Sequence, residues 1–98
     1  MLDITFEWDS AKAKAHLRKH GVAFEEAETV LSDDFALLID DPDHSDDEER
    51  FVLLGLSTTL RILAVLHAHR SAPDTIHVIS ARKATASERT TYVERPRP

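Results

Sequence analysis

Hydrophobic residues recur along the chain with two different spacings, and these spacings predict where strands and helices lie. Residues 4–8, ITFEW, alternate as a short strand does. Segments 35–40, 50–57, 61–70 and 75–80 are rich in Val, Ile and Leu and are bounded by turn residues, which predicts further strands. Their connections are too short for crossover helices, so we expect a mainly antiparallel meander.

Helical spacing begins in residues 10–20, where Asp9 or Ser10 supplies an N-cap oxygen and Gly21 provides the C-terminal stop. One side of this predicted helix carries four side chains that grip phosphate or transfer protons: Lys12, His16, Lys19 and His20. An ordinary solvated helix face carries such side chains as well, so the pattern alone leaves both interpretations open.

Two more segments have helical spacing. Residues 23–31 place four apolar side chains on one face, Phe24, Ala27, Val30 and Leu31. Residues 84–94 begin with Thr85 and Glu88 at the spacing of a capping box, but their apolar face is meagre. Helices and strands together predict an α+β fold.

The composition indicates one domain, residues 1–98, without cysteine. The start, MLDITFEWD, lacks the features of a signal peptide, and we expect a soluble cytoplasmic protein. The net charge of −6 is unevenly divided: residues 1–49 carry fifteen acidic and four basic residues, and residues 50–98 carry three acidic and eight basic ones. Halves of −11 and +5 indicate two surfaces with different partners, one of them a polyanion. Seven of the acids fall between Asp40 and Glu49, which predicts an exposed loop.

Metal and nucleophile chemistry find little support in the sequence. His67 and His69 share one strand face, and His16 and His20 lie one helical turn apart, but neither pair has a third ligand nearby in sequence. The acidic loop lacks the glycine and the final glutamate of a calcium-binding loop. No G-x-S-x-G motif accompanies any serine. We therefore expect no metal and no other cofactor.

Metal-independent RNA cleavage needs no protein nucleophile, because the 2′-hydroxyl of the substrate attacks the adjacent phosphate. The protein supplies a base, an acid and cations. In segment 75–82 we expect Ile76, Val78 and Ser80 to alternate against His77, Ile79 and Ala81, with the strand ending before Arg82. Arg70, Arg82 and Lys83 would then converge at strand ends beneath Arg89 and Tyr92, although Tyr92 also suits a helix anchor.

Three blocks of the sequence resemble the BrnT family of ribonuclease toxins: FEWDxxK at the start, KHGVxFxEA next, and ISARxAT later. The resemblance runs from Phe6 to Glu94. It implies a RelE-like fold, with N-terminal helices on a mainly antiparallel sheet of four to five strands and a C-terminal helix. It also implies an endoribonuclease toxin that inhibits translation, a BrnA-like ribbon-helix-helix antitoxin, and contact with operator DNA through that antitoxin only.

The resemblance carries over to particular residues, Glu88 among them. Together with the residue chemistry, it gives two sets of site residues. The catalytic set is His67, His69, Arg70, Arg82 and Tyr92, and the RNA-binding set is Lys12, His20, Lys83 and Arg89. In the first helix we expect Lys12 or His20 at the rim of the cleft, with His16 and Lys19 solvated.

Two positions depart from the family pattern. His16 stands where Asn is usual, and His69 stands where an acid is usual. The arginine-rich run after the ISARKAT block is also thinned to ASERTTYVE. These departures leave an alternative open: a catalytically weak or dead module that acts through antitoxin binding and operon repression.

Overall fold

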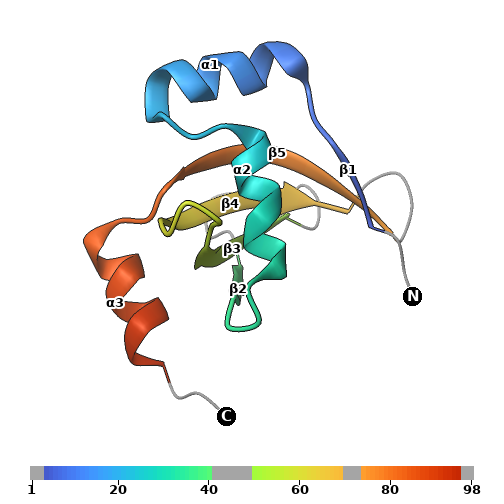
Figure 1. Ribbon diagram of the computed structural model, residues 1–98. Coiled ribbons are helices and arrows are strands. Elements are labelled where there is room, and N and C mark those ends of the chain that lie inside the picture. The colour runs from blue at the N-terminus through green and yellow to red at the C-terminus, as the bar shows by residue number, and fades with distance from the viewer. Residues whose placement is uncertain (1–3, 41–49, 70–73, 96–98) are drawn as a thin grey trace.

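Five strands form one mixed sheet in the order β1-β5-β4-β3-β2 (Figure 1). The structure is a computed structural model that describes residues 4–40, 50–69 and 74–95. The elements are β1 Thr5–Glu7, α1 Ser10–His20, α2 Phe24–Thr29, the 3-10 helix η1 Val30–Ser32, β2 Leu37–Asp40, β3 Arg50–Leu56, β4 Ile62–Ala68, β5 Thr75–Lys83 and α3 Ala86–Glu94. The predicted acidic loop and Arg70 lie outside the described residues.

The antiparallel meander is confirmed for β2 to β5, in which each strand pairs with the next along the chain. β1 differs because it joins the opposite edge and runs parallel to β5. The backbone N–H of Thr5 donates to the carbonyl oxygen of Asp74 at 2.9 Å, where β1 begins. The observed α+β fold therefore has a mixed sheet with one parallel edge.

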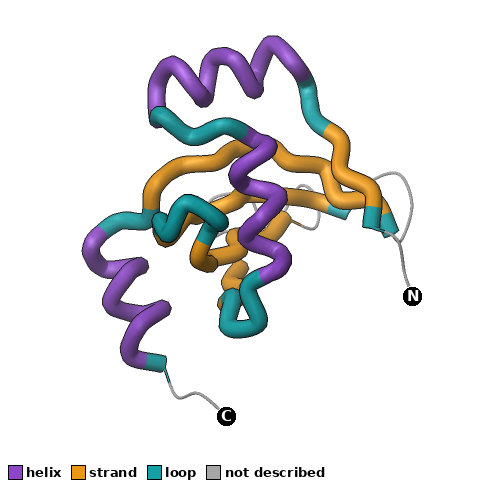
Figure 2. Tube along the Cα trace, viewed as in Figure 1, coloured by secondary structure: helices purple, strands orange, loops and turns teal. Residues whose placement is uncertain are grey.

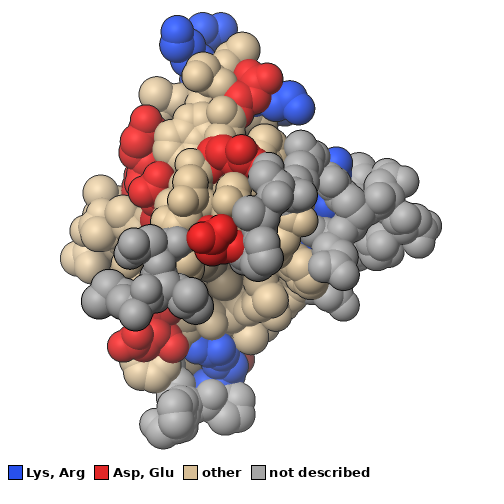
Figure 3. Space-filling model, turned by 90° about the vertical axis from the view of Figure 1, so that its right-hand side faces the viewer, with Lys and Arg blue, Asp and Glu red and all other residues tan. Residues whose placement is uncertain are grey.

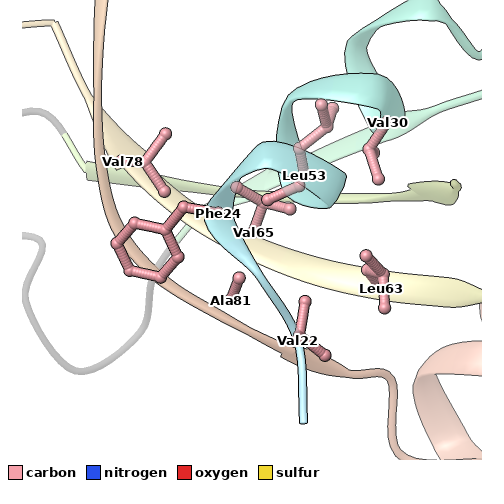
Figure 4. Packing of buried hydrophobic residues seen from close by; sticks show 9 residues of the cluster. Val22, Phe24, Val30, Leu53, Leu63, Val65, Val78 and Ala81 are labelled. Carbon is pink, nitrogen blue, oxygen red and sulfur yellow. The ribbon is translucent and has the colours of Figure 1, made fainter. Parts of the chain in front are cut away.

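Helices lie on both faces of the sheet (Figure 2). α1 and α2 lie over one face, which we call the covered face. The main core fills the space beneath them, with Phe24 and Val30 packed on Leu63, Val65 and neighbouring residues (Figure 4). We call the opposite face the open face. Of the described helices α3 packs there, through the smaller cluster of Leu54, Ala64 and Tyr92. None of the described helices is long and apolar enough to span a bilayer.

The predicted helix boundaries are largely confirmed. Asp9 caps α1 by accepting from the backbone N–H groups of Ala11 and Lys12, at 2.8 and 3.1 Å. Gly21 ends α1 in the left-handed region, at φ 71°. The capping box of Thr85 and Glu88 is present. Leu31 was expected to be buried, which is wrong: the helix tightens into η1, and Leu31 is 36% exposed.

A β-bulge in β5 overturns the simple alternation expected there. Leu66 pairs with Ser80, but the next residue, His67, pairs with Val78, so that Ile79 is an extra residue. An extra residue reverses the side-chain alternation beyond it. Consequently Val78 and Ala81 both join the core of the covered face. His77, Ser80 and Arg82 all share the open face, and the strand continues to Lys83 rather than ending before Arg82.

Gly55 of β3 packs tightly against Val30 of η1. A Cβ atom added at Gly55 would lie 2.5 Å from Cγ1 of Val30 and 3.2 Å from Cβ of Ala36. Because overpacking of this kind typically costs about 1–3 kcal/mol, we expect Gly55→Ala to lower the free energy of urea unfolding by that amount. The cost should shrink in a Val30→Ala background; an equal cost in both backgrounds would contradict the proposed clash.

Candidate functional site

Two predicted catalytic histidines lie at the end of β4, on the covered face. His67 is 4% exposed and packs between Phe51 and His69, with ring centroids 6.1 and 5.6 Å away. Burial lowers the pKa of His67; a weak contact of its Nδ1 with the carbonyl oxygen of Val65 opposes this, and His69 lowers the pKa further. His67 is therefore held neutral behind the exposed His69.

Arg82 lies on the open face, because it pairs with Ala64 across the sheet. Its guanidinium makes two hydrogen bonds to the carboxylate of Glu88 in α3, at 2.7 and 3.0 Å, and a third to the carbonyl oxygen of Lys83 at 3.3 Å. The bond from Arg82 is the main reason that the pKa of Glu88 is lowered. Since a guanidinium has five N–H donors, two remain for a ligand.

Two further predicted residues flank Arg82 with different orientations. Arg89 is exposed on α3 and lines a surface hollow of about 340 Å³ together with Ile62 and Val93. Lys83 is exposed at the end of β5, but it pairs with Leu63 and so belongs to the covered face. Arg89 follows Glu88, the partner of Arg82, on α3, whereas Lys83 points to the other side of the sheet.

Tyr92 anchors α3 to the sheet. Its side chain is 5% exposed, and its hydroxyl donates to Oδ2 of Asp33. The same carboxylate accepts from the backbone N–H groups of Phe35 and Leu56, at 3.0 and 2.9 Å. Arg95 adds a hydrogen bond to the carbonyl oxygen of Phe35. These contacts join the end of α3 to the loop before β2, and they hold the Tyr92 hydroxyl inside the protein.

α1 places its basic side chains over the covered face. Lys12 is exposed and His20 is partly exposed. The expectation that His16 is solvated is wrong: its ring packs on Phe24 and stacks on His20, with centroids 5.5 and 5.4 Å away. Burial, followed by the charges of His20, Lys19 and Lys12, lowers the pKa of His16. Its buried Nδ1 has no hydrogen-bond partner among the described residues.

The structure therefore separates the described site residues into four groups: His67 and His69 at the end of β4, Arg82, Arg89 and Tyr92 where α3 meets the open face, Lys83 on the covered face at the end of β5, and Lys12 and His20 on α1. Lys and Arg side chains are visible over α1 at the top of Figure 3, while Asp and Glu occupy the middle of that view. Among residues 4–40, 50–69 and 74–95, no three His, Asp or Glu side chains gather as metal ligands would.

The structure contains two ionic contacts that the sequence did not predict. The first joins Nδ1 of His77 to Oε1 of Glu7, 3.5 Å apart, where β1 and β5 pair. The strand period had placed His77 on a face without showing which residue lies opposite. Because this partner comes from a parallel strand far away in sequence, no local pattern points to it.

The second contact fastens α2 to the turn between β3 and β4. Nε of Arg61 donates to Oε2 of Glu26 at 3.0 Å, and its Nη2 donates to Oε1 of Glu26 and to the carbonyl oxygen of Gly21. The hydroxyls of Ser57 and Thr59 also donate to Glu26. The bond from Arg61 is the largest influence that lowers the pKa of Glu26 to about 2. This network is structural, since it fixes α2 over the sheet.

Comparisons with known proteins agree with this architecture. The family model described as "Ribonuclease toxin, BrnT, of type II toxin-antitoxin system" matches residues 8–88. Among solved structures, the ribonuclease toxin BrnT of Brucella abortus is similar, with 27% sequence identity and a TM-score of 0.65. The match covers 85% of this chain and 99% of that one. No curated protein matches.

The fold and the family match place the chain among the ribonuclease toxins of type II toxin–antitoxin systems. It belongs to the BrnT family. Such a toxin has an antitoxin as its partner.

Proposed function

We propose that this protein is an endoribonuclease that binds RNA along the open face of its sheet and cleaves it by general acid–base chemistry without a metal ion. The observation that carries the proposal is the guanidinium of Arg82, in a chain that belongs to a ribonuclease family. It lies on the open face, is oriented by both oxygens of Glu88, and retains two N–H donors.

The chemistry follows from these groups. The 2′-hydroxyl attacks the adjacent phosphorus, the bond to the 5′-oxygen breaks, and a 2′,3′-cyclic phosphate is left. Arg82 binds a phosphate of the RNA strand, Arg89 holds a neighbouring one, and a cation beside the cleaved phosphate stabilises the negative charge that grows on it. An imidazole that faces the bound RNA supplies the proton transfers. Tyr92 keeps α3, and with it Glu88 and Arg89, in place.

In the cell, we propose that the protein cuts RNA in the cytoplasm and thereby inhibits translation. Its antitoxin would be a BrnA-like ribbon-helix-helix protein, which would also carry the complex to operator DNA. On α2, the exposed Glu25 and the partly exposed Glu28 favour a basic segment of that partner through charge attraction.

The proposal is tested with the purified chain and a short labelled RNA in buffer that contains EDTA. We expect cleavage with a 2′,3′-cyclic phosphate end, and a single 2′-deoxy substitution at the cleaved nucleotide should abolish it, because the attacking group is then missing. The product end is identified by mass spectrometry. Cleavage that requires added divalent cations, or that continues at the deoxy nucleotide, would overturn the proposed chemistry.

One observation favours a second candidate function. His67 and Arg82, two of the predicted catalytic residues, lie on opposite faces of the sheet. The alternative is thus a catalytically weak module that acts by binding its antitoxin. Expression of the chain without antitoxin separates the two: an active nuclease arrests growth and degrades RNA, whereas the weak module does neither.

A further inference from the structure

We propose that Glu7, His77 and Arg50 form the reaction centre of this nuclease, on the open face of the sheet, with His77 as the base that activates the 2′-hydroxyl. This inference rests on the proposed function, because it takes the chain to be a nuclease. It assigns the proton transfer to His77 rather than to His67 or His69.

The sheet places these residues in one row. Glu7 pairs with His77, His77 pairs with Ala68, and Ala68 pairs with Arg50. Residues paired directly across neighbouring strands point to the same face. The row therefore crosses β1, β5, β4 and β3, which lie side by side (Figure 1). The row lies on the open face, which also carries Arg82 and, at the far end of the sheet, α3.

The carboxylate of Glu7 suits a role in orienting His77. The 3.5 Å contact joins Oε1 of Glu7 to Nδ1 of the imidazole, so Nε2 lies on the other edge of the ring. A carboxylate beside one ring nitrogen fixes the orientation and the tautomer of the ring. The side chain of His77 is 20% exposed, so that it contacts both the protein and solvent.

Arg50 supplies positive charge at the other end of the row. Two strand spacings separate it from His77, about 10 Å between backbones, and the residue between them is the small Ala68. A long guanidinium side chain and an imidazole can approach each other across that interval. A phosphodiester bound there would have a base on one side and a phosphate ligand on the other.

The bulge in β5 connects this row to Arg82. In a regular strand, residues 77 and 82 would lie on opposite faces, because their separation is an odd number. The extra residue, Ile79, brings His77 and Arg82 to the same face. About 15 Å of strand separates them, so a short single strand of RNA, and not one nucleotide, would contact both.

The proposed step balances as follows. Nε2 of His77 takes the proton of the 2′-hydroxyl while the bond from the 2′-oxygen to phosphorus forms. The bond between phosphorus and the 5′-oxygen breaks, and the leaving oxygen takes a proton from water. The hydroxide that remains accepts the proton of the imidazolium, which restores His77. Arg50 stabilises the charge on the phosphate oxygens during the step.

The test measures single-turnover cleavage of a short RNA by His77→Ala, with Thr75→Ala as the matched control. Thr75 lies two residues earlier on the same strand and the same face. We expect His77→Ala to slow cleavage at least about 100-fold, the usual loss of a general base, and Thr75→Ala to have no effect. Added imidazole should restore part of the rate of His77→Ala, which a merely structural defect would not allow.

Companion variants separate the other roles. Arg50→Ala should lose about 100-fold in rate without rescue by imidazole. Glu7→Gln should lower kcat and leave KM unchanged, because Glu7 acts through His77. If His77→Ala fails to fold by circular dichroism, His77→Gln, which is closer in size, replaces it, with the same expected loss.

The outcomes distinguish this inference from the function on which it rests. A wild-type chain that cleaves no RNA overturns both. A wild-type chain that cleaves, while folded His77→Ala or His77→Gln cleaves at the same rate, overturns the inference and leaves the nuclease intact. A slow but folded His77→Ala without imidazole rescue also overturns the role of His77 as the base.

Discussion

Replacing Arg82 with alanine should lower the rate of RNA cleavage at low RNA concentration by about 10- to 100-fold, the loss expected when charge-assisted hydrogen bonds to a phosphate are removed. The reason is geometric: Glu88 fixes the guanidinium by two hydrogen bonds, so its two remaining N–H donors are oriented before RNA binds. The rate is measured under single-turnover conditions, and RNA affinity is measured separately with an uncleavable 2′-deoxy substrate.

Three variants control this experiment. Arg18→Ala removes the same charge from an exposed position of α1, over the other face, and should cleave normally. Arg82→Lys keeps the charge without the planar fork and should recover only part of the rate. Glu88→Gln keeps an acceptor for the backbone N–H of Thr85 and should lose less than Arg82→Ala. Equal rates for Arg82→Ala and wild type would remove Arg82 from the site.

Local patterns predicted the elements whose causes are local. The caps at Asp9, Gly21 and Thr85 lie within a few residues of the helices that they begin or end, and they were predicted correctly. The meander of β2 to β5 also followed from the sequence, because each strand pairs with its neighbour along the chain. The resemblance to the BrnT family, which three sequence blocks carry, agrees with the match of the family model to residues 8–88.

The candidate site was less predictable because one residue changed its geometry. Nothing in the run TIHVISARK marks Ile79 as the extra residue of a bulge, and strict alternation had placed His77 with Ala81. The error exchanged the faces of every side chain after the bulge. Arg82 consequently lies on the face opposite His67.

Contacts between residues far apart in the sequence were also not predicted. Arg61 and Glu26 are thirty-five residues apart in sequence, and Tyr92 and Asp33 are fifty-nine apart. A charged or phenolic side chain shows in a sequence that it needs a partner, but it does not show which one. The alternative interpretation of Tyr92 as an anchor came from the meagre apolar face of its helix, and the contact with Asp33 agrees with it.

Glu26→Ala should destabilise the fold by about 2–3 kcal/mol, because Arg61, Ser57 and Thr59 lose their shared charged acceptor. For a domain of this size that loss lowers the melting temperature by about 10–20 °C. Unfolding in urea can be followed by the fluorescence of Trp8, which packs on Phe24 beneath α1. Glu25→Ala is the matched control, since the neighbouring Glu25 is exposed and has no ion pair among the described residues.

The same carboxylate predicts how stability depends on pH. The pKa of Glu26 is lowered from 4.5 to about 2 in the folded protein, chiefly by the bond from Arg61. A lowered pKa in the folded state means that the unfolded chain takes up the proton first. The stabilisation is therefore complete above pH 4.5 and is lost as the pH falls toward 2. Glu26→Gln, with no proton to bind, should lose less stability over that range than wild type; parallel losses in the two proteins would show that this carboxylate does not carry the acid sensitivity.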